Sequence, residues 1–312
     1  MSRAPLKLLA FDGAFNLPLW VAESQGFFAR QGLEVTLAFT PTSGFLVQAL
    51  MKGSADIALC GFDNIAAYQL GQGEAELAEP PDLRAFMAGD PGFLALVARP
   101  GIDSIAALRG ATLSVDALST GFAFVLREML ARAGLAADAV QIVRAGGTAT
   151  RYAELLAGRH DATLLRTPYE RLAMAQGFRL LGRPREWLGP YLGTVAAARR
   201  RWIDAHRGSV AGFLQAYREA LRWIADPGHA AEACAELIAH HEGLDAMTAP
   251  QVLQDLLDRE HGLVRDMAFD RRAIDTVLAL RGKYGAALPV DLDPAGLLAL
   301  DIAPTPGIGS EA

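Results

Sequence analysis

The sequence contains one pattern of helix end, turn and strand twice, 105 residues apart. Residues 49–64 read ALMKGSADIALCGFDN, and residues 154–169 read ELLAGRHDATLLRTPY. In each copy a helix-like run passes through Gly-x-x-Asp, Gly53 to Asp56 in the first and Gly158 to Asp161 in the second, and then enters a short apolar strand. The glycine is typical of a helix end, and the apolar run is typical of a buried strand.

The repeat extends outward into a larger unit. Residues 34–56 align with residues 139–161 without a gap, each as strand, turn and helix. Longer copies, roughly 6–62 and 112–166, read strand, helix, strand, helix, strand. Such alternation predicts parallel sheets built from right-handed βαβ units. The match can come from duplication of one unit or from convergence, because βαβ units in general share these turn residues. Either origin implies two similar α/β lobes.

The rest of the chain suggests how the lobes are joined. After residue 200 the pattern changes to four amphipathic helices with no strand between them. Two extended apolar segments, Phe93 to Pro100 and Tyr191 to Arg199, run between the lobes. Two crossings make one lobe an insertion in the other, with a ligand cleft between them. We therefore predict a two-lobed α/β fold with parallel-rich sheets flanked by helices, two hinge crossings and a helical C-terminal region. Lobe one comprises 1–96 plus 197–312, and lobe two comprises 97–196.

Composition excludes several classes of protein. The 312 residues are 52% hydrophobic, which is enough for a large core and about two domains. The net charge of −6, without a Lys/Arg block, argues against a nucleic-acid partner. Cys60 and Cys234 form no CxxC pair, so neither a disulfide framework nor a zinc site is expected. The opening MSRAPLKLLAF lacks a secretory signal, which favours either a cytoplasmic protein or a mature form.

Candidate ligand-binding residues lie where strands end. In open parallel sheets, ligands bind beyond the carboxyl ends of the strands, where helix N-termini attract anions. The candidates at these tips are Asp12, Phe15, Asn16, Thr42, Ser43, Gly61, Phe62, Asp63 and Asp90 in lobe one, and Ser119, Thr120, Gly121, Thr148 and Arg166 in lobe two.

Arg166 is the strongest candidate for contact with an anion. It follows the strand 162–165, so its guanidinium should emerge at a strand end, where a fork of donors suits a carboxylate. The alternatives are a surface arginine or an ion pair with Glu170. Arg144 and Arg151 are weaker candidates for this contact and are expected on solvated faces. Acidic tips on one lobe and Arg166 on the other suggest a ligand with an anionic end and an amine or hydroxyl end.

Signals of catalysis are weak. GxSxG, HExxH and Walker A motifs are absent, and no histidine precedes His160, so the first tips of lobe one supply no histidine for acid–base chemistry. His240 and His241 are expected on a solvated helix face, and Cys60 in the core. We therefore expect no enzyme activity, no metal and no cofactor.

Four stretches resemble a known family. LPLWVAESQGFFARQGLEVTL (17–37), LMKGSADIALCG (50–61), SIAALRGATLSV (104–115) and ELLAGRHDATLL (154–165) resemble the substrate-binding proteins of ABC importers of the sulfonate/nitrate/thiamine-precursor type (NMT1/THI5-like, SsuA-like). The resemblance covers roughly residues 6–225. It implies a type II periplasmic-binding fold and a periplasmic monomer that clamps a small molecule and delivers it to ABC permease subunits. Ligands of the family include sulfonates, nitrate, aromatic carboxylates, riboflavin and aminopyrimidines.

The resemblance also assigns roles to the tips. Asp12 to Asn16, Thr42 to Gly44 and Gly61 to Asp63 match the three ligand-facing tips of the first lobe, and Ser119 to Gly121 matches the anion-contacting helix start of the second. Arg166-Thr167 departs from the Glu-Pro or similar pair often found there, which leaves the ligand class open.

Three functions follow. The first is a solute-binding protein for a small organic anion, such as an aromatic carboxylate, a sulfonate or an aminopyrimidine. The second is an enzyme on the same fold, a decarboxylase or lyase with Asp12, Asp63 or Asp90 as acid or base and Arg166 as anchor; the pyrimidine-synthase branch is disfavoured because its histidine and cysteine-rich stretch are absent. The third is a cytoplasmic ligand sensor.

Overall fold

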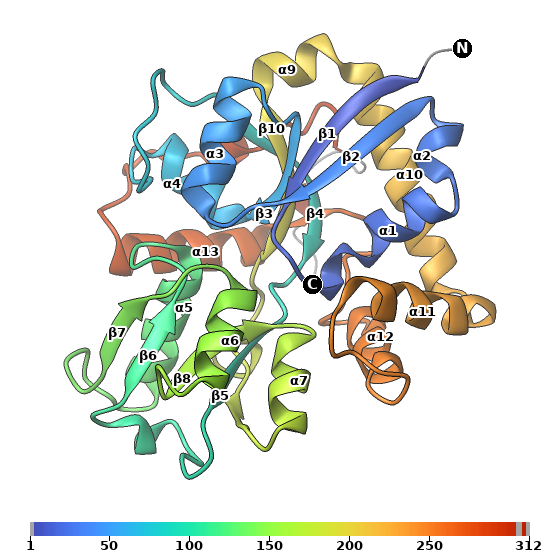
Figure 1. Cartoon of the computed structure of the whole chain (residues 1–312). Coiled ribbons are helices and arrows are strands. Elements are labelled where there is room, and N and C mark those ends of the chain that lie inside the picture. The colour runs from blue at the N-terminus through green and yellow to red at the C-terminus, as the bar shows by residue number, and fades with distance from the viewer. Residues whose placement is uncertain (1–2, 304–307, 310–312) are drawn as a thin grey trace.

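The chain folds around two five-stranded sheets (Figure 1). The structure, a computed structural model, describes residues 3–303 and 308–309. The first sheet has the order β2-β1-β3-β10-β4, and the second has the order β7-β6-β8-β5-β9. The strands are β1 (Ala4–Ala10), β2 (Leu33–Phe39), β3 (Ile57–Gly61), β4 (Leu83–Asp90), β5 (Leu94–Ala98), β6 (Thr112–Val115), β7 (Gln141–Arg144), β8 (Ala162–Arg166), β9 (Arg179–Gly182) and β10 (Thr194–Arg199).

The two sheets share one plan. In the first, β1 pairs in parallel with β2 and β3, and β10 lies antiparallel between β3 and β4. In the second, β6 pairs in parallel with β7 and β8, and β5 lies antiparallel between β8 and β9. Each antiparallel strand is thus the one that follows a crossing from the other lobe. The predicted two-lobed α/β fold with parallel-rich sheets is confirmed.

The crossings lie close to the predicted hinge. The chain leaves the first sheet at Asp90 and enters the second at Leu94, and it returns at Thr194. The boundaries predicted at 96/97 and 196/197 fall inside β5 and β10, each of which belongs to a single sheet. The division into 1–96 with 197–312 and 97–196 stays a prediction, and sheet membership would move both boundaries by a few residues.

The repeated Gly-x-x-Asp turn has the same hydrogen bonds in both lobes. Gly53 and Gly158 end their helices with φ of 72° and 68°, the left-handed conformation that glycine adopts at low cost. The aspartate three residues later then accepts a hydrogen bond from the first sheet's Lys7 N–H, or from the second sheet's Thr112 N–H, at 2.8 Å in each case. The turn therefore ties the end of each helix to β1 of the first sheet or β6 of the second, and its role is structural.

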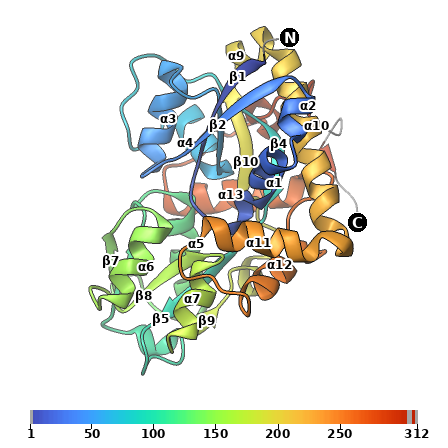
Figure 2. The ribbon, with the colours of Figure 1, turned by 45° about the vertical axis from the view of Figure 1, so that its right-hand side comes forward.

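Helices flank both sheets (Figures 1 and 2). Helices α1, α2 and α10 cover one face of the first sheet, and α3 and α4 lie on the other. Along β3 the side chains alternate accordingly: Ile57 and Leu59 belong to the α10 side of the core, and Ala58 and Cys60 to the α3 side. The helices are α1 (Leu17–Ser24), α2 (Phe27–Arg30), α3 (Ser43–Lys52), α4 (Phe62–Gln69), α5 (Gly121–Arg132), α6 (Thr148–Leu156), α7 (Tyr169–Ala175), α8 (Arg185–Leu188), α9 (Arg200–Ala205), α10 (Arg207–Ala225), α11 (Ala230–His240), α12 (Ala249–Leu257) and α13 (Arg271–Tyr284).

The C-terminal region differs in detail from the sequence prediction. Five helices, α9 to α13, occupy the region expected to hold four, because the chain leaves helical geometry at His206 (φ −126°, ψ 35°), whose ring stacks on Trp202. A two-residue strand, β11 (Phe269–Asp270), pairs with β12 (Ile308–Gly309), although no strand was expected there. Helix α13 lies between the two lobes, packed against α4 of the first and α5 of the second (Figure 1).

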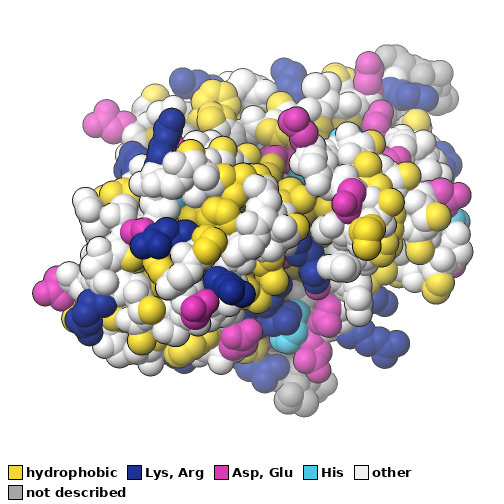
Figure 3. Space-filling model, turned by 60° about the horizontal axis from the view of Figure 1, so that its bottom comes forward, with side chains coloured by type: hydrophobic (Ala, Val, Ile, Leu, Met, Phe, Trp, Pro, Cys, Tyr) yellow, Lys and Arg dark blue, Asp and Glu magenta, His cyan; other side chains and the backbone are white. Residues whose placement is uncertain are grey.

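The exposed surface carries both signs of charge. On the described part of the face in Figure 3, Lys/Arg and Asp/Glu side chains are interspersed rather than separated. This mixture agrees with a composition of 29 Lys and Arg against 35 Asp and Glu. Among the residues described, we find no helix with the length and apolar character that crossing a membrane requires.

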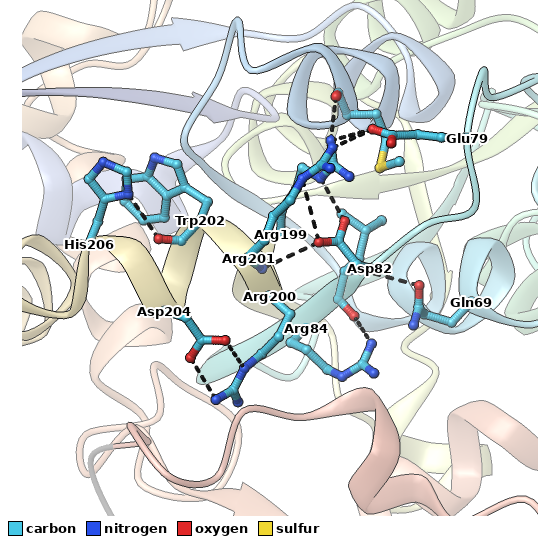
Figure 4. Close-up of polar contacts among 12 residues, drawn as sticks. Gln69, Glu79, Asp82, Arg84, Arg199, Arg200, Arg201, Trp202, Asp204 and His206 are labelled. Carbon is cyan, nitrogen blue, oxygen red and sulfur yellow. Dashed lines mark hydrogen bonds and ion pairs between the residues drawn. The ribbon is translucent and has the colours of Figure 1, made fainter.

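A cluster at the end of β10 fixes the loop between α4 and β4 (Figure 4). The guanidinium of Arg199 donates to Asp82 at 2.6 Å, to Glu79 at 2.7 Å and to the carbonyl of Met51 at 2.7 Å. Arg199 is buried, whereas its neighbour Arg201, which also pairs with Glu79, is more than half exposed. The cluster anchors one end of the loop that carries Glu74 to the cleft.

We predict that Arg199→Met lowers the free energy of unfolding by about 1.5–3 kcal/mol, because charge-assisted hydrogen bonds to two carboxylates and a carbonyl are lost. Urea titration of both proteins measures the difference. Arg201→Met is the matched control and should change stability by less than about 0.5 kcal/mol. Equal losses in the two variants would contradict the role given to Arg199.

Candidate functional site

Four helices begin around one cavity between the lobes. Helices α3 and α4 contribute from the first lobe, and α5 and α6 from the second. The inner cavity has a volume of about 30 Å³, which is room for one water molecule. It is lined by Phe11, Ser43, Gly61, Asp63, Asn64, Asp116, Thr120, Gly121, Phe122, Gly147, Thr148, Arg151 and Arg166.

A larger space adjoins it. The outer cavity has a volume of about 530 Å³ and shares Ser43, Asp63, Asn64, Asp116 and Thr120 with the inner one. Its other walls come from the loop 72–75, the turn 41–44 and the segment 116–120. The two cavities together form the candidate site.

The lobes are in contact across the inner cavity. A Cβ placed on Gly121 would lie 2.5 Å from the Cβ of Asp63, so only glycine permits this approach. On the other side of the hinge, the N–H of Ala14 donates to the carbonyl of Thr167 at 3.0 Å. The structure is therefore a closed form, with the lobes in contact on both sides of the inner cavity.

Arg281 of α13 joins the two lobes. Its guanidinium makes a bidentate pair with Asp63, at 2.6 and 2.5 Å, and also donates to the carbonyl of Ser119 at 3.1 Å. Both charged side chains are at least 95% buried. Asp63 was expected to contact the ligand; it lines the cavity, and its charge is matched by Arg281.

Arg166 connects both hinge crossings. Its Nη2 lies 3.1 and 3.2 Å from the carboxylate of Asp90 and donates to Thr194 Oγ1 at 2.8 Å, while Nε donates to the carbonyl of Gly92 at 2.8 Å. The guanidinium lies 3.4 Å from the ring centre of Phe15. Neither sequence alternative is right, since the side chain is 3% exposed and its ion-pair partner is Asp90 rather than Glu170.

A third contact closes the outer cavity. Glu74, on the loop anchored by Arg199, accepts hydrogen bonds from the N–H and hydroxyl of Ser119 at 3.0 and 2.6 Å. Its second oxygen pairs with Arg144 at 2.7 Å. Arg144 is largely exposed, as expected, and serves this interlobe contact.

The predicted site residues separate into two groups. Thr42, Ser43, Gly61, Asp63, Ser119, Thr120, Gly121, Thr148 and Arg166 line the inner or outer cavity. Asp12, Phe15, Asn16 and Phe62 line neither of these cavities, and Asp90 faces a different one. Asn16 holds the first loop through hydrogen bonds to the carbonyls of Phe11 and Gly13, and Phe62 is fully buried.

Two charged residues of the cavity were not among the predicted site residues. Arg151, expected on a solvated face, is 2% exposed; it donates to the carbonyls of Gly146 and Leu164, and its Nε has no partner among the described residues. Asp116 follows β6 as Asp12 follows β1, and that position after a strand is the signal that could have identified it. For Arg151 the signal was its place one turn after Thr148, on the same side of α6.

His241 also departs from expectation. It is 4% exposed, not on a solvated face, and Nδ1 lies 4.0 Å from Asp12, to which Tyr169 of the other lobe donates a hydrogen bond. Burial lowers the pKa of His241, although Asp12 opposes the effect. Nε2 of His241 has no partner among the described residues, and the described parts of the chain hold no cluster suited to a metal. This group is an interlobe contact beside the candidate site.

A third cavity lies behind the hinge. Its volume is about 910 Å³, and its walls come from α7 to α8 and from residues 255–273. Glu170 lines it, is 1% exposed, and has Arg183 as its nearest cation at 3.8 Å. Burial raises the pKa of Glu170 to about 7, and Arg183 only partly offsets this.

We predict that Glu170→Gln gains stability relative to the parent protein as pH rises. The unfolded chain releases this proton near pH 4.5, whereas the folded protein retains it to about pH 7. The free energy of unfolding of the parent protein is therefore unaffected by this proton below pH 4.5. It falls as pH rises from 4.5 to 7, by up to roughly 3 kcal/mol in total. Urea titrations at pH 4.5, 6 and 8 measure the difference, with exposed Glu232→Gln as control. A pH-independent difference would contradict the prediction.

We predict that Arg166→Met costs about 3–5 kcal/mol of stability, because Asp90 is left buried without its counter-charge. The double variant Arg166→Met/Asp90→Asn should recover much of the loss, which denaturant unfolding of the four proteins of the cycle will measure. Arg179→Met, from an exposed pair with Asp103, is the control and should be nearly neutral. A double variant less stable than the single one would contradict the prediction.

The chain resembles several solved structures. SsuA, the alkanesulfonate-binding protein of Xanthomonas axonopodis pv. citri bound to MOPS, aligns with a TM-score of 0.72 at 18% identity over 89% of this chain and 91% of that one. The nitrate-binding protein NrtA of Synechocystis PCC 6803 aligns with a TM-score of 0.77 at 14% identity, over 94% and 84%. The desulfurization enzyme DSZB aligns with a TM-score of 0.64 at 15% identity, over 95% and 97%. At these identities the likeness shows the fold.

A comparison with curated protein sequences found no match. The family models gave a match to most of the chain, and it agrees with the resemblance that the four sequence stretches carry. The chain belongs to the NMT1/THI5-like family, whose model matches residues 16–230.

Proposed function

We propose that the protein is a solute-binding protein that holds a small organic anion between its lobes and delivers it to an ABC permease. The observation that carries the proposal is the convergence of four helix N-termini, two from each lobe, on one cavity. Unpaired N–H groups and the helix dipole favour negative charge there. Membership of the NMT1/THI5-like family supports the same function.

The second lobe offers the better anion contacts. In α3, Thr42 Oγ1 accepts from Phe45 N–H at 3.1 Å and so caps the helix. Among the described residues, α4, α5 and α6 have no such side-chain cap. In α4 the first N–H, that of Phe62, donates to the carbonyl of Gly193 at 2.8 Å, so the first N–H groups of α5 and α6 are the more available ones. Thr148 and Arg151, both on α6, add a hydroxyl and a buried guanidinium to the same wall. A carboxylate, sulfonate or similar oxyanion fits these donors.

The ligand enters through hinge opening. The inner cavity has room for only one water molecule, but together with the outer cavity the space falls within the size range of common ligand pockets. Two interlobe contacts would form at the end of a closing movement: Gly121 with Asp63, and Arg281 with Ser119. On this basis the ligand is small, with its anionic group at α5 and α6.

The enzyme alternative gains little from the geometry. Asp63 and Asp90, two of the candidate acid–base groups, are held in ion pairs by Arg281 and Arg166. Asp12 accepts from Tyr169 and does not line the inner or outer cavity. These contacts support binding without turnover. The proposed periplasmic location, monomeric state and membrane permease partners rest instead on the family to which the chain belongs.

The test is a thermal shift against sulfonates, aromatic and aliphatic carboxylates, nitrate, aminopyrimidines and flavins. A ligand at 100 times its dissociation constant should stabilise the protein by about 2.7 kcal/mol, and chromatography should recover it unchanged. Conversion of the added compound to product would favour the enzyme. Absence of a shift with every oxyanion would contradict the proposed ligand class.

We predict that Gly121→Ala weakens ligand binding at least tenfold while leaving the protein folded. The added methyl group meets Asp63 only when the lobes close, so the open form is unaffected. Titration calorimetry with a ligand from the panel measures the affinity. Gly208→Ala, at a helical glycine with open space around it, is the matched control. Unchanged affinity in Gly121→Ala would contradict closure by this contact.

A further inference from the structure

Asp116 is an acidic side chain of the cavity wall without an ion pair. It follows β6 and lines both the inner and the outer cavity. Its Oδ1 accepts from Thr120 Oγ1 at 2.7 Å. Among the residues described, no Lys, Arg or His nitrogen lies within 4.0 Å of it; besides Thr120, its nearby donors are the backbone N–H groups of Asp116 and Ala117. Two carboxylate oxygens with these neutral donors retain acceptor capacity for a ligand group.

The other carboxylates near the cavity differ in this respect. Asp63 is engaged by two nitrogens of Arg281, and Asp90 by Arg166 together with Gly92 N–H. Glu74 pairs with Arg144 across the lobes. A positively charged ligand group would have to displace an arginine at any of these sites, but not at Asp116.

Arg151 is the complementary group on the same wall. Its side chain is 98% buried and lines the inner cavity, and its Nε lacks a partner among the described residues. Arg151 and Asp116 form no ion pair within 4.0 Å. Burial is the larger influence on the pKa of both residues, but each charge favours the charged form of the other residue. The second lobe thus contributes one carboxylate and one guanidinium to the inner cavity, and neither forms an ion pair with another described residue.

We infer that the ligand is a small zwitterion or amino-substituted oxyanion, and that Asp116 sets this specificity by accepting a hydrogen bond from the ligand's ammonium or N–H group. The anionic group then lies at the N-termini of α5 and α6, near Arg151. This inference rests on the proposed function and refines its ligand class.

Charge balance supports this choice over a plain anion. A ligand without a donor would leave this acceptor capacity of Asp116 unused in a closed cavity and close to a second negative charge. Burial already raises the pKa of Asp116, with Arg151 and Thr120 opposing the effect. An ammonium group beside the carboxylate removes both penalties, because it supplies the hydrogen bond and the opposite charge.

The experiment uses two matched pairs of probes, taurine against ethanesulfonate and β-alanine against propionate, titrated calorimetrically into the whole chain. The parent protein should bind the amino member of at least one pair about tenfold or more tightly than its partner. Asp116→Asn should abolish that preference, and ethanesulfonate or propionate should then bind as well as the amino compound. Asp103→Asn, at an exposed aspartate of the same lobe, should keep the parent's preference.

The outcomes separate the two proposals. Equal binding of both members by the parent protein overturns the zwitterion inference and leaves the oxyanion-binding function in place. If a folded Asp116→Asn variant still prefers the amino compound, the inference is also overturned, because another residue must then bind the ligand's amino group. If no member of either pair binds the parent protein and the thermal panel gives no shift with any oxyanion, both proposals fail.

Discussion

The two lobes depend on one buried arginine for the geometry of their hinge. Arg166 ends a central strand of the second sheet, yet its hydrogen bonds go to Asp90 at the end of β4, Gly92 in the first crossing and Thr194 at the start of β10. The planar guanidinium of Arg166 thus forms hydrogen bonds to both crossings and links them to the second lobe. Because the pair is fully desolvated, its removal would leave a buried charge, and the angle between the lobes would lose its main polar constraint.

The C-terminal helix provides the second connection. Helix α13 packs between α4 and α5, and Arg281 joins Asp63 of the first lobe to Ser119 of the second. Phe124 of α5 stacks on Tyr284 at the end of the same helix, with ring centres 6.2 Å apart. An element far along the chain therefore completes the wall of a site whose other parts come from the first 166 residues.

Local pattern was enough to predict the fold but not the charge pairing of the site. The Gly-x-x-Asp repeat identified two matching lobes because its glycine conformation and its aspartate hydrogen bond are both local to one helix and its neighbouring strand. Strand ends likewise located the turns at Ser43 and Gly121. The partners of Asp63 and Arg166 lie 218 and 76 residues away, and such pairings leave no periodic signal. His241 was missed for the same reason, because packing against another element, not sequence spacing, buries it, whereas the place of Arg151 one turn after Thr148 was a local signal.

The central claim is that the lobes close around a small ligand, and small-angle X-ray scattering tests it most directly. The protein should have a larger radius of gyration when free than in the presence of a saturating ligand from the thermal panel. The ligand-bound curve should then match the closed form described here, in which Gly121 touches Asp63. Identical scattering with and without a saturating ligand would contradict hinge closure as the means of binding.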